Sequence, residues 1–398
     1  MSLSNGRTYL AIPGPSVMPD SVLRAMQRPA PNIYEGEIVG VAETITRDLK
    51  RAARTEHDVA LYICNGHGTW EAALANTVQP GETVLVPATG RFAHGWAEIA
   101  RGQGIEVQII EFGKSTPFDP AAVEAALRAD TAGKIKAVLA THVDTSGGIL
   151  NDIPALRAAI DATGHDALLM ADCVASMVCD RFEMDAWGVD VAISASQKGF
   201  MTPPGLGFVF FGPKAAAARG RIANVQRYWD WVPRANPQMF YQYWGGTAPT
   251  HHVFALRAAL DLINDEGIEA IWARHDRLAR AIWAAIKAWG QGGSLRFNMP
   301  DTAFRSRAVT ALSMQSPDAA RLRAWLEQKA GVTLGIGLGM ADPGSPEADG
   351  FFRIGHMGHL NAHMVMGVLG TIQAAFEALE VPHGPGGLDA AARVIAAA

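Results

Sequence analysis

Short runs of β-branched and aliphatic residues recur through the first half of the chain, and they constrain the fold more than any other feature. Most of these runs are apolar at nearly every position instead of alternating with polar residues. Such runs are typical of strands buried on both faces, which occur in parallel sheets covered by helices on each side. The runs lie at residues 59–64, 83–88, 107–112, 136–143, 167–172, 191–195 and 206–212.

The stretches between these runs have the residue spacing of helices. Residues 69–78 and 154–164 carry apolar residues at helical intervals and are bounded by Gly or Pro. Alternating strands and helices are typical of parallel sheets. The sequence therefore predicts an α/β fold with a mostly parallel seven-stranded sheet flanked by helices.

The chain is longer than one hydrophobic core usually supports, and its pattern changes after Gly212. A chain of 398 residues is expected to form two domains. Residues 227–252 are rich in aromatic residues, Pro and Gly, which predicts a long ordered loop. Longer helical patterns and short strands follow and indicate a smaller α+β domain. We predict an N-terminal arm at 1–20, a large domain at 21–255 and a small C-terminal domain at 256–398.

Net charge and cysteine content indicate what kind of partner the protein binds and in which cellular compartment it works. The formal net charge of −5 gives no basic surface for nucleic acid, so a small-molecule partner is expected. Three cysteines, Cys64, Cys173 and Cys179, form no even disulfide framework and indicate a reducing compartment. The first residues lack the apolar core of a signal peptide, and no run approaches the roughly 20 apolar residues of a membrane span. A cytoplasmic location is therefore expected.

Several common catalytic motifs are absent from the sequence. Motifs of P-loop, zinc-protease, hydrolase-elbow and dinucleotide-binding sites do not occur. His251 and His252 are adjacent, but neighbouring side chains point in different directions and no cysteine or acidic partner stands nearby. We therefore predict no metal site.

Polar residues instead stand directly after the predicted strands, where open α/β sheets bind their ligands. Residues 65–69, NGHGT, form a glycine-rich turn into a helix. Free N–H groups in such a turn suit a phosphate, and an ordinary tight turn is the alternative. Asp172 ends one apolar run. A buried carboxylate there needs a cation or hydrogen-bond donors, and capping of the next turn is the alternative.

Lys198 follows the next run and should emerge at the same edge of the sheet as Asp172. An amine kept partly desolvated near a cationic ring has a lowered pKa and attacks carbonyls, whereas a lone lysine is more often a solvated surface residue. Thr145, in THVDTSGG, offers a hydroxyl near this edge or caps a turn. Phe92, also after a strand, is placed to stack on a ring or to pack in the core.

Pyridoxal phosphate has the three groups that these residues would bind. Its phosphate matches the glycine-rich turn, its pyridine nitrogen matches the carboxylate, and its aldehyde matches the lysine. The turn, Asp172 and Lys198 follow one another on successive units of one predicted sheet. We therefore expect pyridoxal 5′-phosphate as the cofactor.

At these motifs the chain resembles the class V aminotransferases of fold type I, in particular the alanine-glyoxylate and serine-glyoxylate group. The resemblance runs nearly from end to end. Its most specific part is ADCVAS with SQKG, in which Lys198 follows Asp172 by 26 residues. The motifs are PGPSVMPDSVLRAM (13–26), NGHGTWEAALAN, THVDTSGG, ADCVAS, SASQKGFMTPPG and FRIGHMG (352–358).

The resemblance implies a role for each matching residue of the large, cofactor-binding domain. It implies that Lys198 forms the internal aldimine and that Asp172 pairs with the pyridinium nitrogen. Phe92 is implied to stack on the ring, and Val174 to pack on the opposite face. The implied phosphate ligands are the backbone of Gly66, His67 and Gly68 and the side chain of Gln197.

The resemblance also implies a homodimer with shared active sites. Thr247 matches a threonine that reaches the phosphate of the neighbouring subunit, and Trp244 stands where some relatives have a phosphate-binding tyrosine. Arg353 matches the arginine that grips the substrate carboxylate, a role that its planar fork of donors suits. Thr145 is a further candidate for contact with the cofactor ring or the substrate, and Tyr34 is a candidate for contact with the substrate.

The implied reaction is a ping-pong transamination from alanine or serine to glyoxylate or pyruvate through Lys198. Residues 31–40 depart from the wording common in the serine-glyoxylate members. Tyr34 and Glu35 lie there, and Glu35 would disfavour an acidic donor if it points inward. The alternatives are a pyridoxamine-pyruvate aminotransferase, which shares the RIGHMG wording, and a class V lyase such as a cysteine desulfurase, which would need a mobile catalytic cysteine.

Overall fold

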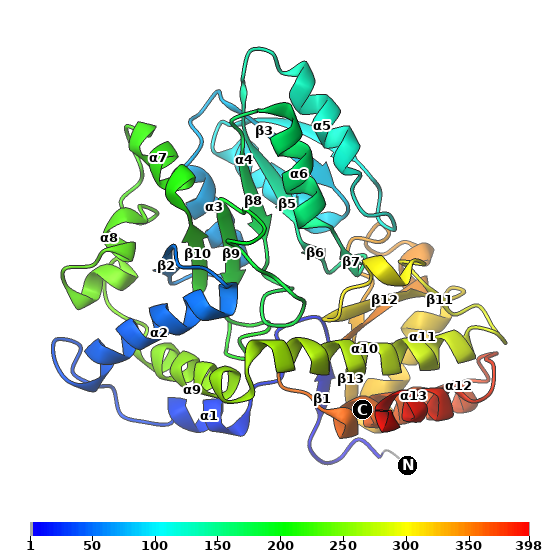
Figure 1. Ribbon diagram of the computed structural model, residues 1–398. Helices are drawn as coiled ribbons and strands as arrows, with labels where there is room; N and C mark the ends of the chain where they lie inside the picture. The colour runs from blue at the N-terminus through cyan, green and yellow to red at the C-terminus, as the bar shows by residue number, and fades with distance from the viewer. Residues whose placement is uncertain (1–2, 398) are drawn as a thin grey trace.

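A computed structural model describes residues 3–397 of the chain. Residues 1–2 and 398, which fall in the predicted arm and the predicted small domain, lie outside the described residues. Figure 1 shows a larger and a smaller sheet, each with helices packed around it. The long helix α10 (Ile268–Trp289) passes in front of the smaller sheet in this view.

The larger sheet contains seven strands in the order β2-β10-β9-β8-β5-β3-β4. β10 runs antiparallel to β2 and β9, and the other six strands are parallel to one another. The mostly parallel seven-stranded sheet predicted from the apolar runs is therefore confirmed. The strands are β2 (Asp58–Tyr62), β3 (Thr83–Ala88), β4 (Glu106–Glu111), β5 (Ile135–Thr141), β8 (Leu168–Asp172), β9 (Val191–Ala195) and β10 (Gly207–Phe211).

Helices bury both faces of this sheet and form a separate core on each. One core includes side chains from α1 (Asp20–Met26), α2 (Glu37–Ala53), α5 (Pro120–Ala129), α6 (Ile153–Thr163) and α9 (Thr250–Glu266). The other includes side chains from α3 (Gly66–Ala75), α4 (Arg91–Gly102), α7 (Pro213–Arg221) and α8 (Val232–Ala235).

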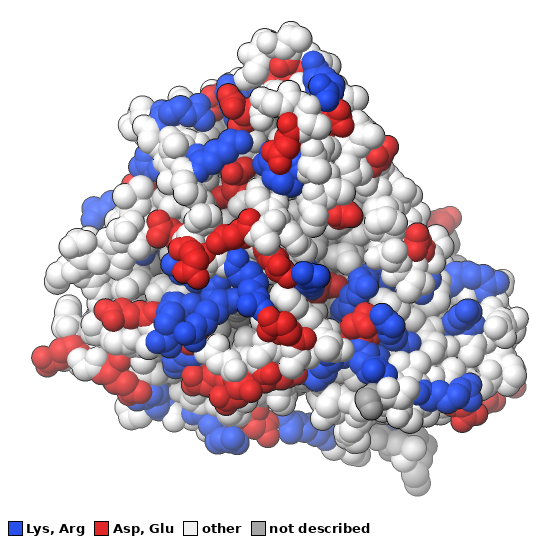
Figure 2. All heavy atoms as spheres, in the orientation of Figure 1, with Lys and Arg blue, Asp and Glu red and all other residues white. Residues whose placement is uncertain are grey.

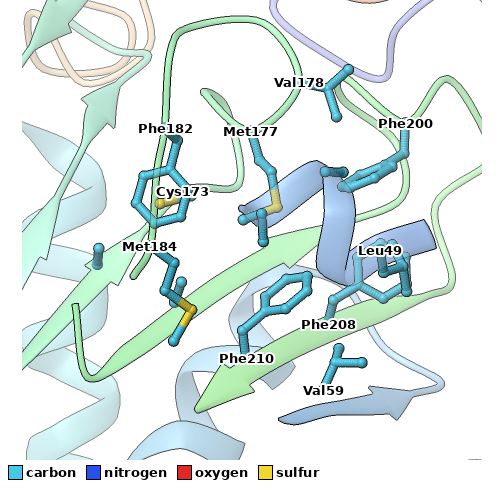
Figure 3. Packing of buried hydrophobic residues seen from close by; sticks show 14 of the residues in the cluster. Leu49, Val59, Cys173, Met177, Val178, Phe182, Met184, Phe200, Phe208 and Phe210 are labelled. Carbon is cyan, nitrogen blue, oxygen red and sulfur yellow. The ribbon is translucent and has the colours of Figure 1, made fainter. Parts of the chain in front are cut away.

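Strand β10 illustrates why the runs in the sequence are apolar throughout. Phe208 and Phe210 pack in the first core, whereas Val209 and Phe211 pack in the second. Successive side chains of a strand point to opposite faces, so burial of both faces requires an apolar residue at every position. Figure 3 shows Phe208 and Phe210 facing Leu49 of α2.

The smaller sheet contains five strands in the order β1-β13-β14-β12-β11. Strand β1 comes from the N-terminal arm and pairs with β13 in parallel, so the arm forms one edge of this sheet. The strands are β1 (Tyr9–Ala11), β11 (Arg296–Phe297), β12 (Val309–Ser313), β13 (Val332–Ile336) and β14 (Phe351–Gly355). The helices besides α10 are α11 (Asp318–Trp325), α12 (Ala362–Ala378) and α13 (Gly387–Ala396).

The two sheets belong to different hydrophobic cores. Helix α9 spans the predicted boundary after residue 255, and its buried side chains pack in the core of the larger sheet. From Leu278 onwards, the buried side chains of α10 pack in the core of the smaller sheet. None of the helices within residues 3–397 combines the length and the hydrophobicity needed to cross a bilayer. Figure 2 shows basic and acidic side chains intermixed over this face of the molecule.

The aromatic segment 227–252 is anchored by a buried arginine. The guanidinium of Arg234 donates to the carbonyl oxygens of Leu61 and Tyr228, both at 2.7 Å. The segment contains α8 and a 3-10 turn at Phe240–Trp244, and it reaches α9 without a regular strand. The prediction of a loop over 227–252 is therefore correct only in part, because the segment contains α8 and this turn and its last residues begin α9.

Candidate active site

The parallel strands of the larger sheet carry the predicted site residues to one edge. Because these strands run in the same direction, their carboxyl ends meet there. Asn65 follows β2, Gly90 follows β3, Asp172 ends β8 and Lys198 follows β9. After β5, a hairpin of β6 (Val143–Asp144) and β7 (Ile149–Leu150) carries Thr145.

The glycine-rich turn forms the N-terminus of α3. Asn65 caps the helix, and its side-chain oxygen accepts a hydrogen bond from the His67 N–H at 3.1 Å. The first hydrogen bond along the helix axis is donated by the Thr69 N–H to the Asn65 carbonyl. The N–H groups of Gly66 and Gly68 therefore have no partner within the helix, at the positive end of its dipole. This arrangement can bind a phosphate.

Close packing accounts for the two glycines in this turn. A Cβ atom at Gly66 would lie 2.9 Å from Cγ2 of Val174. A Cβ atom at Gly68 would lie 2.6 Å from Cβ of Cys64. Burial and the nearby charge of Arg91 lower the pKa of His67 from 6.5. The turn therefore presents backbone donors and a mainly neutral imidazole at neutral pH.

Asp172 is 4% exposed and accepts two hydrogen bonds from neutral donors. Its Oδ1 accepts from the Val174 N–H at 2.9 Å, and its Oδ2 accepts from the indole Nε1–H of Trp70 at 3.1 Å. Burial raises the pKa of Asp172 to about 7, even though both donors favour the ionised form. A cation beside this carboxylate would therefore be bound favourably.

Lys198 is held by the N-terminal arm. Its Nζ donates a hydrogen bond to the carbonyl oxygen of Pro13, and its own carbonyl accepts from the Ser16 hydroxyl at 2.7 Å. Gly14, with φ of +96°, packs directly against the lysine side chain. Burial, assisted by the charge of Arg353, lowers the pKa of Lys198 to about 8. A neutral, nucleophilic amine is therefore accessible near neutral pH.

Arg353 reaches the site from β14 of the smaller sheet. Its Nε donates to the carbonyl of Ile336 at 2.6 Å, and its Nη1 donates to the carbonyl of Thr145 at 3.0 Å. Burial lowers the pKa of Arg353 to about 10, while the charge of Asp144 acts in the opposite direction. Among residues 3–397, no carboxylate forms an ion pair with Arg353. A buried guanidinium without a carboxylate partner among these residues suits a substrate carboxylate.

Phe92 lies in the first turn of α4 and is positioned by Asp144. The Phe92 N–H donates to Oδ2 of Asp144 at 3.0 Å, and the Ser146 N–H donates to Oδ1 at 2.9 Å. Gly90 is required beside this carboxylate, because a Cβ atom there would lie 2.6 Å from Cγ of Asp144. The β6–β7 hairpin therefore fixes the helix start that carries the aromatic ring.

These groups fit pyridoxal 5′-phosphate. The unpaired N–H groups of Gly66 and Gly68 suit its phosphate, Asp172 suits its ring nitrogen, and Lys198 suits its aldehyde. Within residues 3–397, Oε1 of Gln197 is buried without a hydrogen-bond partner, which leaves this amide available to a bound group.

Two predicted site residues, Tyr34 and Thr247, lie away from this cluster within one chain, and so does Trp244. Tyr34 is 88% exposed, on the loop between α1 and α2, which runs along the left edge of Figure 1. Thr247 is exposed in the aromatic segment. Trp244 is 0% exposed and packs in the core of its own subunit, so it cannot take the place of a phosphate-binding tyrosine.

Sequence reasoning gave no role to Pro13, Ser16, Trp70 or Asp144. Pro13 and Ser16 lie in the PGPS motif, and Asp144 lies in THVDTSGG. Both motifs are visible in the sequence, but neither indicates which contacts these residues make. Within residues 3–397, no three His, Cys, Asp or Glu side chains are grouped as metal ligands would be.

The sequence profile of the family Aminotransferase class-V matches residues 8–355. The chain belongs to the class-V aminotransferase family. The serine–glyoxylate aminotransferase of Methylorubrum extorquens is 36% identical over 373 residues, which cover 92% of this chain and 90% of that protein. The L-aspartate–glyoxylate aminotransferase of Paracoccus denitrificans is 34% identical and covers 93% of this chain and 91% of its own.

Solved structures agree with this assignment. The pyridoxamine-pyruvate aminotransferase of Mesorhizobium loti matches the fold with a TM-score of 0.87 at 25% identity, over 100% of both chains. The fold type I architecture and the family expected from the sequence are therefore confirmed, and this class-V protein is an aminotransferase.

Proposed function

We propose that this aminotransferase uses pyridoxal 5′-phosphate to move the amino group of alanine or serine to glyoxylate or pyruvate. The observation that carries the proposal is the grouping of the half-buried Lys198 with the buried Asp172 and Arg353. The charges of Asp172 and Arg353 both act on the Lys198 amine. Two of these residues come from neighbouring strands of the larger sheet and the third comes from the smaller sheet.

Four parts of the chain would hold the cofactor. The backbone of Gly66, His67 and Gly68, with the Gln197 side chain, would bind the phosphate. Asp172 would receive the ring nitrogen, and Phe92 and Val174 would cover the ring. The bound cofactor supplies an aldehyde that joins to amines and a ring that takes up the electron pair left at the substrate Cα.

The side chains then divide the work of transamination. Arg353 fixes the substrate carboxylate, with its guanidinium oriented by the carbonyl of Thr145, so that the Cα–H bond is aimed at Lys198. The Lys198 amine, with a pKa of about 8, takes the proton from Cα and returns one later. Asp172 would favour a protonated ring nitrogen in the bound cofactor, because its own buried charge requires a cation. The same residues serve a second oxo acid in the return half-reaction.

The choice of donor rests on the relatives. Their names pair glyoxylate with serine, with aspartate or with alanine. Glu35 was expected to disfavour acidic donors if it pointed inward. In this chain Glu35 is exposed and its Oε1 accepts from Asn32 Nδ2 at 3.2 Å, so it lies outside the site of its own subunit. Aspartate therefore belongs among the donors tested.

Two alternatives have less support. A pyridoxamine-pyruvate aminotransferase has the same fold, but its 25% identity lies below the 34% to 36% of the glyoxylate relatives. A lyase with a catalytic cysteine requires an accessible thiolate. Burial raises the pKa of Cys64 and Cys179 to about 12, and raises that of Cys173 well above its ordinary value.

We further propose a homodimer in which Thr247 reaches the phosphate of the neighbouring subunit. Support comes from the aromatic segment, where Val232, Met239 and Tyr241 are exposed large hydrophobic residues beside the exposed Thr247. A cytoplasmic location is part of the proposal, and the three unpaired cysteines support it.

The test is spectroscopic. The purified protein is loaded with pyridoxal 5′-phosphate, and alanine, serine, aspartate and pyridoxamine are added separately. Loss of the visible cofactor band with alanine or serine, and its return with glyoxylate or pyruvate, is the expected result. A response to pyridoxamine alone would favour the second candidate. Turnover by a Lys198→Ala variant would refute the role of that lysine.

A further inference from the structure

The indole of Trp70 is the only side chain of residues 3–397 that donates a hydrogen bond to the Asp172 carboxylate. The distance from Nε1 to Oδ2 is 3.1 Å, and Trp70 is 2% exposed. An indole N–H donates and cannot accept, so this contact stabilises the negative carboxylate without competing for its proton. The nearby charged groups, Lys198 and Asp144, form no hydrogen bond with Asp172.

The same helix contacts both the last residue of β8 and the turn that follows it. Gly66, the first residue of α3, packs against the side chain of Val174. Trp70 lies four residues later, on the same face of the helix, and contacts Asp172. The N-terminus of α3 carries the proposed phosphate donors, so one rigid helical turn connects that site to the carboxylate.

Packing around Trp70 holds its indole in place. Trp96 stacks on it with ring centroids 6.0 Å apart and an interplanar angle of 13°. Phe92 meets it edge-on at 6.4 Å, and the His67 ring lies at 4.6 Å. The indole therefore has little freedom to turn away from Asp172, and it also contacts the aromatic ring proposed to cover the cofactor.

We propose that Trp70 is a positioning residue that fixes the Asp172 carboxylate, in its ionised form, at a set distance from the phosphate-binding turn. The expected consequence, tight binding of a protonated cofactor ring, rests on the proposed function. The hydrogen bond itself is a property of the chain alone. The two can therefore be tested separately.

Trp96 provides a matched control. It is fully buried beside Trp70, and within residues 3–397 its Nε1 has no hydrogen-bond partner. Trp70→Phe and Trp96→Phe each replace one buried indole by a phenyl ring. Only the first removes a hydrogen bond to Asp172.

The first measurement uses full-length, cofactor-free protein with ¹⁵N-labelled tryptophan, which has ten indole N–H resonances. Asp172→Asn is expected to shift one of them strongly, and the shifted resonance should be the one missing from Trp70→Phe. The Trp96 resonance, identified with Trp96→Phe, should move little. If no indole resonance responds to Asp172→Asn, the inference is wrong. This refuting result needs no tryptophan variant to fold.

The second measurement is the dissociation constant of pyridoxal 5′-phosphate. Trp70→Phe should weaken binding roughly ten- to a hundredfold, the usual effect of losing a hydrogen bond to a charged group. Trp96→Phe should weaken it much less. Equal losses in both variants would overturn the inference. If the unmodified protein does not bind the cofactor, the proposed function fails, whereas the indole measurement still decides the hydrogen bond.

Discussion

Replacing Asp172 by asparagine should change the stability of the cofactor-free protein by an amount that depends on pH. The free energy of unfolding of the variant minus that of the unmodified protein should be larger above pH 7 than at pH 4. Asp172 is buried, and its pKa of about 7 lies far above the 3.8 of a free side chain. Asparagine has nearly the same shape and cannot ionise. The comparison therefore isolates the charge of a single buried group.

The sign follows from proton binding. Between pH 3.8 and pH 7 the folded chain keeps the Asp172 proton that the unfolded chain has released. The free energy of unfolding of the unmodified protein therefore falls as the pH rises through this interval, and is constant with respect to this group outside it. At 1.36 kcal/mol per pH unit, the interval corresponds to about 4 kcal/mol.

Asparagine also has a constant cost that does not affect the comparison. Two donors, the Val174 N–H and the Trp70 indole, point at the carboxylate, and the amide group can accept from only one of them at its oxygen. The lost bond lowers the stability of the variant by about 1 kcal/mol at every pH. The quantity to measure is therefore the difference in the free energy of unfolding between the two proteins, and how much this difference changes from pH 4 to pH 8.

The assay is urea unfolding of both cofactor-free proteins at several pH values, followed by tryptophan fluorescence. Asp180, a buried carboxyl with a pKa of about 6, is present in both proteins and cancels. Stabilities that change in parallel from pH 4 to pH 8 would show that Asp172 does not hold a raised pKa. Bound cofactor should reverse the order above pH 7, because only the carboxylate gains a cation.

Three other substitutions test the remaining parts of the site. Gly68→Ala should weaken cofactor binding about tenfold or more, because its Cβ would lie 2.6 Å from Cβ of Cys64, whereas Gly102→Ala, with open space around it, should leave the dissociation constant unchanged. Arg353→Lys should raise KM for amino and oxo acids roughly ten- to a hundredfold, because lysine lacks the planar guanidinium that donates to the carbonyls of Ile336 and Thr145. An unchanged KM would exclude Arg353 from carboxylate binding. Mixing inactive Lys198→Ala subunits with Thr247→Val subunits should restore activity if subunits exchange and sites are shared. A steady-state rate of the mixture equal to the mean of the two separate variants would argue against shared sites.

The edge of the sheet that carries the site could be predicted because it follows from local pattern. Burial on both faces leaves a continuous apolar run, and residues directly after parallel runs emerge at one edge. Asp172 and Lys198 stand directly after two such runs, which became the neighbouring strands β8 and β9. Trp70 shows the opposite case. In the sequence it is one apolar position of a helix, and no local pattern distinguishes an indole that donates to a carboxylate from one that fills a core.

The seven strands of the larger sheet and the candidate residues that follow them could be read from the sequence, because they depend on spacing and residue type. The antiparallel direction of β10 could not. The contacts of each candidate site residue came from the folded chain alone. Pro13 meets Lys198 across 185 residues, Trp70 meets Asp172 across 102, and Thr145 meets Arg353 across 208. These contacts hold the Lys198 amine in place, stabilise the charge of Asp172 and orient Arg353, while burial lowers the pKa of Lys198. They arise where helices and two separate sheets pack together, and the geometry of that packing depends on the whole chain.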